Sequence, residues 1–164
     1  MTPRSVADWL LSIEGIDGVT FSGGEPFEQA RTLTRVIDHV RAERDLSVMS
    51  FSGYTLESLR AYGTPAQQAY LDRLDLLVDG PYDRTRHSDL LWRGSSNQRI
   101  HLLTQRHRDL APQFETGQSA GLEFHIDSEA NTVQWLGVPA VRNFRQSFEQ
   151  GLRRTHLLQL RSQS

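Results

Sequence analysis

Cysteine is absent from the 164-residue chain. This absence excludes disulfides, thiolate nucleophiles, zinc-thiolate sites and cysteine-ligated iron-sulfur clusters built from these residues alone. No apolar run approaches the roughly 20 residues of a membrane span, and the first residues lack the apolar stretch of a signal peptide. The formal net charge of -2 gives no general attraction to nucleic acid or to an anionic membrane. We therefore expect a cytoplasmic protein that binds neither nucleic acid nor a membrane.

Motifs of several common enzyme classes are also absent. The six histidines are scattered without the HxxxH spacing of a metal site. There is no Ser-His-Asp order, no GxxxxGK[ST] loop and no GxGxxG dinucleotide motif. From the residues alone, we therefore predict no catalytic side chain and no metal ligand.

The composition is that of an ordinary globular protein, with 37% hydrophobic and 23% charged residues. The length suits one domain, which we expect over residues 1–164. Apolar spacing predicts strands that alternate with helices, as in an α/β fold with a mostly parallel sheet. The expected helices are 5–14, 27–44, 55–62 and 65–73, and the expected strands are 19–22, 46–52 and 75–79.

The rest of the chain is expected to differ from this pattern. Residues 82–98 are polar and turn-rich, which is typical of a functional loop. A further strand at 100–103, a hairpin of 122–126 with 133–135, and a final helix over 144–152 complete the predicted elements.

The strand at 19–22 leads directly into Gly23, Gly24, Glu25 and Pro26. In α/β sheets ligands bind at the carboxyl ends of strands, and glycines let a small molecule approach the main chain. Main-chain carbonyls there could hold an ammonium group, which needs two or three fixed acceptors. The alternative is that the glycines only form a strand-to-helix turn.

Two further strands end in polar residues. Ser52 and Tyr54 follow the second strand, where they could contact a ligand or simply form a turn and helix cap. Asp79 ends the third strand, where it could bind a cation or orient a ligand, or serve only as the acid of a turn. A candidate partner or substrate loop follows, formed by Arg93, Ser95, Ser96, Asn97 and Gln98. Its alternative is a rigid polar loop.

Four segments together carry a family resemblance. They are GVTFSGGEPF at 18–27, FSGYTL at 51–56, LVDGPY at 77–82 and LWRGSSNQR at 91–99. In this order they resemble the radical S-adenosylmethionine (SAM) activating enzymes of glycyl-radical proteins, and within them the group that activates anaerobic ribonucleoside-triphosphate reductase. The resemblance covers residues 6–99 and fades from about residue 102.

The resemblance implies a fold and a function. The fold would be an incomplete (β/α) barrel, followed here by the hairpin and final helix. The family holds a 4Fe-4S cluster and SAM, and generates a glycyl radical on its reductase partner. It implies that Gly23, Gly24, Glu25 and Pro26 receive the SAM amino group, and that Ser52, Tyr54 and Asp79 lie on the same cofactor rim.

The chain departs from this family in one respect. The resemblance implies a CxxxCxxC motif ahead of the glycine loop, and no cysteine is present. We therefore expect a domain that is N-terminally truncated relative to the family, inactive by itself, with an exposed strand edge that favours self-association. The alternative is a noncatalytic, cluster-free relative that acts as a binding or remnant protein.

Overall fold

The computed structural model describes residues 2–117, 123–127 and 132–136. The chain divides into two compact units, residues 1–117 and 118–164. A single domain over residues 1–164 stays a prediction. The first unit carries all of the sequence-predicted site residues.

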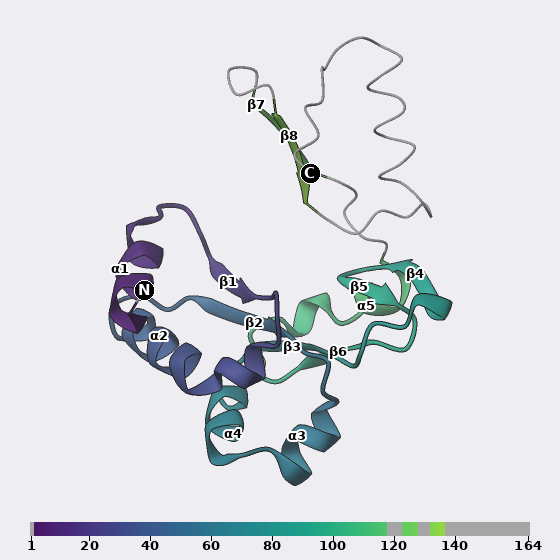
Figure 1. Ribbon diagram of the computed structural model, residues 1–164, viewed down its shortest axis with the longest axis horizontal. Coiled ribbons are helices and arrows are strands. Elements are labelled where there is room, and N and C mark those ends of the chain that lie inside the picture. Colours follow the sequence, from purple (N-terminus) through teal and green to yellow (C-terminus); the bar gives the residue numbers. More distant parts are fainter. Residues whose placement is uncertain (1, 118–122, 128–131, 137–164) are drawn as a thin grey trace, which may run out of the picture. The chain divides into compact units, whose positions relative to one another are not determined.

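A four-stranded sheet forms the centre of the first unit, in the order β1-β2-β3-β6 (Figure 1). The strands β1 (Gly18–Phe21), β2 (Ser47–Phe51) and β3 (Leu76–Asp79) are parallel. The strand β6 (Arg99–Leu102) runs antiparallel to β3. The mostly parallel α/β sheet is thus confirmed, and the described strands form an open sheet and no closed barrel. Strand β1 lies at one edge of it, as predicted.

Threonine caps and prolines set the starts of the helices. Thr2 and Thr64 form capping boxes ahead of α1 (Pro3–Ser12) and α4 (Pro65–Leu71), and each helix has proline in its first turn. Thr55 caps α3 (Leu56–Tyr62). The long helix predicted over 27–44 begins instead as a 3-10 turn, η1 (Pro26–Gln29), and continues as α2 (Ala30–Glu43).

The central strands β2 and β3 are buried. Because side chains alternate along a strand, their residues pack on both faces of the sheet. On one face Val48 and Leu77 pack with residues of η1, α2, α3 and α4, among them Tyr70. On the other face Met49 and Val78 pack with Phe114. Helix α1 packs against α2 beside strand β1 (Figure 1).

The polar segment at 82–98 contains regular structure. A 3-10 turn, η2 (Arg84–Arg86), leads into an antiparallel hairpin of β4 (His87–Leu90) and β5 (Arg93–Ser95). The hairpin turns at Trp92, whose φ of 57° is in the left-handed region. After β6, the chain forms η3 (Arg108–Leu110) and the short helix α5 (Gln113–Thr116).

The second unit contains the predicted hairpin. Strands β7 (Glu123–Asp127) and β8 (Thr132–Leu136) are antiparallel, with Phe124 opposite Trp135. The helix predicted over 144–152 lies outside the described residues. No helix in the described part of the chain is both long and apolar enough to cross a membrane.

Candidate functional site

The carboxyl ends of β1, β2 and β3 lie at one edge of the sheet because these adjacent strands are parallel. Residues 22–26, 52–55 and 79–82 follow these ends and form what we call the strand-end rim. Main-chain hydrogen bonds join the second and third strand ends: Ser52 N donates to Val78 O over 2.9 Å, and Gly80 N donates to Tyr54 O over 3.2 Å. The structure therefore brings most of the sequence-predicted site residues into one connected rim.

The two glycines of the first loop have open main chain. Gly23 and Gly24 are exposed, with φ angles of 83° and 57° that favour glycine. A Cβ on Gly23 would meet no atom within 4 Å, so the backbone conformation and not crowding requires glycine there. Among the described residues, the main-chain groups of these two glycines make no hydrogen bond. They thus form the expected turn and also leave acceptors free.

Glu25 joins the first loop to the second. Its Oε1 accepts hydrogen bonds from Phe27 N and Ser52 Oγ, each over 3.0 Å, and its Oε2 accepts one from Gly53 N over 2.8 Å. The first of these bonds caps η1, where Pro26 occupies the first position and is buried. The Glu25 carboxylate is therefore engaged by the protein and holds the glycine loop in place.

Ser52 and Tyr54 continue this network. Ser52 Oγ also accepts a hydrogen bond from Tyr54 N over 3.0 Å. The Tyr54 side chain is 38% exposed, and its phenol donates to Glu28. That hydrogen bond, with the nearby negative charge of Glu28, raises the pKa of Tyr54. Ser52 thus positions the second loop, while the ring of Tyr54 is presented to solvent.

Asp79 has a fully buried carboxylate at the end of β3. Its Oδ2 accepts a hydrogen bond from Leu56 N over 2.7 Å, at the start of α3. The Arg99 guanidinium donates to both carboxylate oxygens, over 3.1 and 2.7 Å, from the opposite position on β6. These contacts fix the start of α3 relative to two strands.

His101 and Arg99 determine the protonation of Asp79. His101 Nε2 lies 3.0 Å from Asp79 Oδ2, an ion-pair distance, although its N–H is not aligned for a hydrogen bond. Burial by itself raises the pKa of Asp79, but the contacts with His101, Arg99 and Leu56 N outweigh it and hold that pKa well below its usual range. Asp79 is therefore an ionised internal anchor.

The predicted loop at 93–98 divides into two parts. Gln98 Oε1 accepts from Gly94 N over 2.9 Å, and Gln98 Nε2 donates to Gly80 O over 3.1 Å. Asn97 Nδ2 donates to Pro81 O over 2.7 Å, and Ser95 is fully buried. These contacts join the loop to the third strand end and leave Ser96 exposed.

Arg93 does not join the strand-end rim. Its guanidinium donates to Phe114 O in α5. The structure therefore separates Arg93 from the residues that follow it in the predicted loop.

The partners of Asp79 are functional residues that were not predicted from the sequence. Arg99, His101 and Glu57 were not among the predicted site residues, yet Arg99 also binds Glu57 through two hydrogen bonds of 2.9 and 2.6 Å. A signal was present, because Arg99 and His101 alternate along a strand and so share one of its faces. Assigning Arg99 and His101 to Asp79 requires the pairing of β6 with β3, which the sequence did not show.

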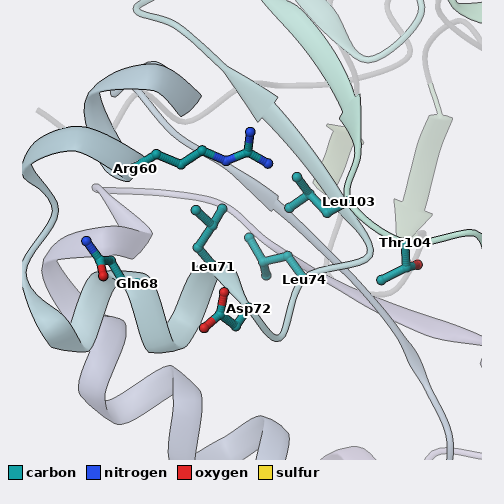
Figure 2. A pocket seen from close by; sticks show the side chains of 7 residues that line it. All are labelled: Arg60, Gln68, Leu71, Asp72, Leu74, Leu103 and Thr104. Carbon is teal, nitrogen blue, oxygen red and sulfur yellow. The ribbon is translucent and has the colours of Figure 1, made fainter.

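A separate pocket of about 320 Å³ lies between α3, α4 and the end of β6. Figure 2 shows the Arg60 side chain extending over Leu71, Leu74 and Leu103, with Gln68, Asp72 and Thr104 at the margin. None of the sequence-predicted site residues lines this pocket. It is therefore distinct from the strand-end rim.

Comparison with known proteins gives relatives that share one name. The chain is 35% identical over 92 residues to the anaerobic ribonucleoside-triphosphate reductase-activating protein of Escherichia coli K12, covering 52% of this chain and 56% of the relative. The protein of that name from Vibrio cholerae is 36% identical over 91 residues (53% and 56%). That of Enterobacteria phage T4 is 30% identical over 95 residues (55% and 56%).

The chain thus spans about half the length of the curated relatives that it matches. No solved structure matches it. A family model for a 4Fe-4S single cluster domain matches residues 5–101, which include the whole strand-end rim and its anchor on β6. The chain therefore belongs to the 4Fe-4S single cluster domain family.

Proposed function

We propose that the strand-end rim binds SAM as part of a system that activates an anaerobic ribonucleoside-triphosphate reductase through a glycyl radical. The observation that carries this proposal is the exposed main chain of Gly23 and Gly24, which is free of hydrogen bonds beside two further strand ends. Carbonyl oxygens in a fixed turn suit the ammonium group of a methionine. The relatives are reductase-activating proteins, which supports the reductase as the kind of partner.

Each rim residue has a role in this proposal. Gly23 and Gly24 present main-chain acceptors, and Glu25 holds them against Ser52 and Gly53. Tyr54 offers an exposed ring for the nucleoside part of the ligand. Pro26 and Asp79 act as internal supports, since both are buried. Ser96, Asn97 and Gln98, with Ser95 beneath them, form the loop that would face the reductase.

The residues of this chain do not fit a 4Fe-4S cluster. Thiolates are missing because the sequence has no cysteine, and the described residues contain no group of three His, Cys, Asp or Glu side chains that could hold a metal. Bound SAM would supply a sulfonium as a radical source, but these residues hold no cluster to reduce it. We therefore propose that the 164-residue chain alone binds SAM without cleaving it.

The second candidate is a noncatalytic, cluster-free relative that binds a partner protein. The observation that favours it is the internal use of the rim carboxylates. Glu25 and Asp79 each accept several hydrogen bonds from the protein, which favours a structural role over acid-base work. Under this candidate the rim is a structural junction and SAM does not bind.

Calorimetric titration of the full chain with SAM tests the proposal. We expect Gly24→Val to weaken SAM binding at least tenfold, because a side chain at φ 57° changes the turn that presents the acceptors. Gly15→Val is the matched control, since Gly15 also has a positive φ, 73°, with open space around it and lies outside the rim. Equal heats for the wild type and Gly24→Val would remove the loop from the proposed site.

Anaerobic reconstitution with iron and sulfide separates the two candidates further. We expect SAM binding, substoichiometric iron and no 5′-deoxyadenosine from the 164-residue chain. Absence of SAM binding together with capture of the reductase would support the noncatalytic candidate. Stoichiometric iron with SAM cleavage would contradict the statement that these residues cannot hold a cluster.

A further inference from the structure

A second pocket, of about 460 Å³, lies against β6 in the first unit. Its residues come from β5, from β6 and from the η3–α5 segment, and we call it the Arg93 pocket. They are Arg93, Arg99, Ile100, His101, Leu102, Ala111 and Phe114. A volume of several hundred cubic ångströms is typical of small-molecule sites. None of its residues belongs to the strand-end rim.

Part of the wall of the Arg93 pocket is apolar. Phe114 is buried and packs with Ile100 and Leu102 on one face of the sheet. The Trp92 ring lies 5.9 Å from that of Phe114, between ring centroids, and supports it from the hairpin turn. This core holds the pocket wall in a fixed shape, so that an apolar group entering the pocket gains contact without reorganising it.

Arg93 places an incompletely paired cation in this apolar setting. Its Nη2 donates to Phe114 O, whereas its Nε is buried with no hydrogen-bond partner. Among the side chains that the structure describes, no carboxylate pairs with it, since every ion pair of the first unit involves other cations. A buried donor without a partner costs free energy, and an anionic ligand would remove that cost.

Arg99, the other arginine of the pocket, is already paired, because it binds both Asp79 and Glu57. His101 Nε2 lies 3.0 Å from Asp79 Oδ2 and makes no hydrogen bond among the described residues. The positive charge available to a ligand is therefore that of Arg93. A guanidinium with a free Nε–H suits a planar carboxylate or a phosphate oxygen.

We infer that the Arg93 pocket binds a small organic anion, a carboxylate or phosphate with an apolar body about the size of a phenyl ring. The anionic group contacts the Arg93 guanidinium, and the apolar body lies between Ile100, Leu102 and Phe114. This inference does not depend on the proposed SAM site, because the two sites share no residue. It defines a ligand site separate from the reductase-activating function.

Binding of three matched probes to the full chain tests this inference. The probes are 3-phenylpropionate, phenyl phosphate and the neutral 3-phenylpropan-1-ol, followed by NMR shifts of residues 93–114. We expect saturable binding of at least one anion and binding of the alcohol at least tenfold weaker. Comparison of the carboxylate with the phosphate shows which anion the pocket prefers. Equal binding of the alcohol, or no binding by either anion, would overturn the inference.

Two variants and a control make the test specific. Arg93→Gln is expected to weaken anion binding about tenfold or more, the size typical of a charge-assisted hydrogen bond. Ala111→Phe fills the pocket and is expected to abolish binding while Arg93 remains. Arg60→Gln is the control, because Arg60 overhangs the other, separate pocket (Figure 2). An equal loss in Arg60→Gln, or full binding in Ala111→Phe, would contradict the assigned site.

Discussion

At the scale of single residues, the two acids of the strand-end rim stabilise the fold by accepting hydrogen bonds from main-chain amides. Glu25 accepts from two main-chain amides and one hydroxyl, and Asp79 accepts from the first amide of α3 as well as from Arg99. Carboxylates are suited to this because each offers about four lone-pair positions. Substitutions at these residues should therefore alter loop geometry and stability before they alter any chemistry.

Glu25→Gln tests the link between the first two loops. The amide keeps the size of the side chain but replaces one acceptor with a donor, so either Gly53 N or Phe27 N loses its acceptor. We expect the free energy of unfolding to fall by about 1–3 kcal/mol and the amide of Gly53 or of Phe27 to exchange faster. Urea unfolding and amide exchange measure these effects. Glu28→Gln, which alters the exposed contact with Tyr54, should leave Gly53 exchange unchanged.

Asp79→Asn tests the buried ion pair. The substitution leaves Arg99 with one charge partner fewer, and we expect a loss of about 3 kcal/mol in the free energy of unfolding. This is the low end for a buried pair because the Arg99 side chain is 46% exposed. Asp45→Asn is the control, since that exposed carboxylate pairs with Arg106 at the surface and should matter far less. Similar losses for both variants would contradict the assigned anchor role.

The lowered pKa of the Asp79 carboxylate predicts that the free energy of unfolding falls in acid. The pKa of Asp79 is lower in the folded chain than its ordinary value of about 3.9, so unfolding takes up a proton in acid. Its stabilising contribution is complete above that ordinary value and is lost as the pH falls toward the lowered one. Urea unfolding between pH 2.5 and 6 should show this loss in the wild type and a flatter acid limb in Asp79→Asn. The hydrogen bond with Arg99 also lowers the pKa of Glu57. Part of the dependence of stability on pH should therefore remain in Asp79→Asn.

At the scale of elements, the sequence located the helices and strands closely. Strand β1 at Gly18–Phe21 was predicted at 19–22, and α4 at Pro65–Leu71 was predicted at 65–73. These succeed because apolar spacing, threonine caps and prolines are local signals. The hairpin of β4 and β5 was not predicted, since its residues are polar and lack strict alternation. Tertiary hydrogen bonds through Gln98 and Ser95 hold this segment.

The cap of α4 provides a test at this scale. Thr64 Oγ1 accepts from Gln67 N over 3.3 Å while the Gln67 side chain accepts from Thr64 N. We expect Thr64→Ala to lower the free energy of unfolding by about 1 kcal/mol, the usual cost of a lost helix cap. Thr32→Ala, at an exposed position in the first turn of α2, should be neutral or slightly stabilising because alanine favours helix and Thr32 is not the cap residue. Thermal unfolding of the two variants measures the difference, and a Thr64→Ala effect no larger than that of Thr32→Ala would argue against the capping box.

At the scale of the whole molecule, β1 leaves one edge of the sheet unpaired among the described strands. An edge strand presents amides and carbonyls that another strand can pair with. This edge strand carries the glycine loop at its end. We therefore expect that pairing of β1 with a second copy of the chain would change access to the strand-end rim.

Thr20→Lys tests association through this edge. Thr20 is exposed on β1, and a charge there opposes edge-to-edge pairing. We expect the weight-average sedimentation coefficient of the wild type to rise with concentration and that of Thr20→Lys to stay near the monomer value. Thr32→Lys, an exposed charge on α2, is the control and should behave as the wild type. A sharp monomeric profile for the wild type at every concentration would contradict the prediction.

The sequence by itself determined the alternating α/β elements, the family resemblance and the lack of thiolate ligands. These follow from local patterns and from composition, which do not depend on how distant segments meet. Only the tertiary structure decided that Glu25 and Asp79 are internal anchors, that Arg93 lies apart from Gln98, and that Arg99 pairs across strands with Asp79. Those outcomes depend on strand order and register, and neither can be inferred from a local sequence pattern.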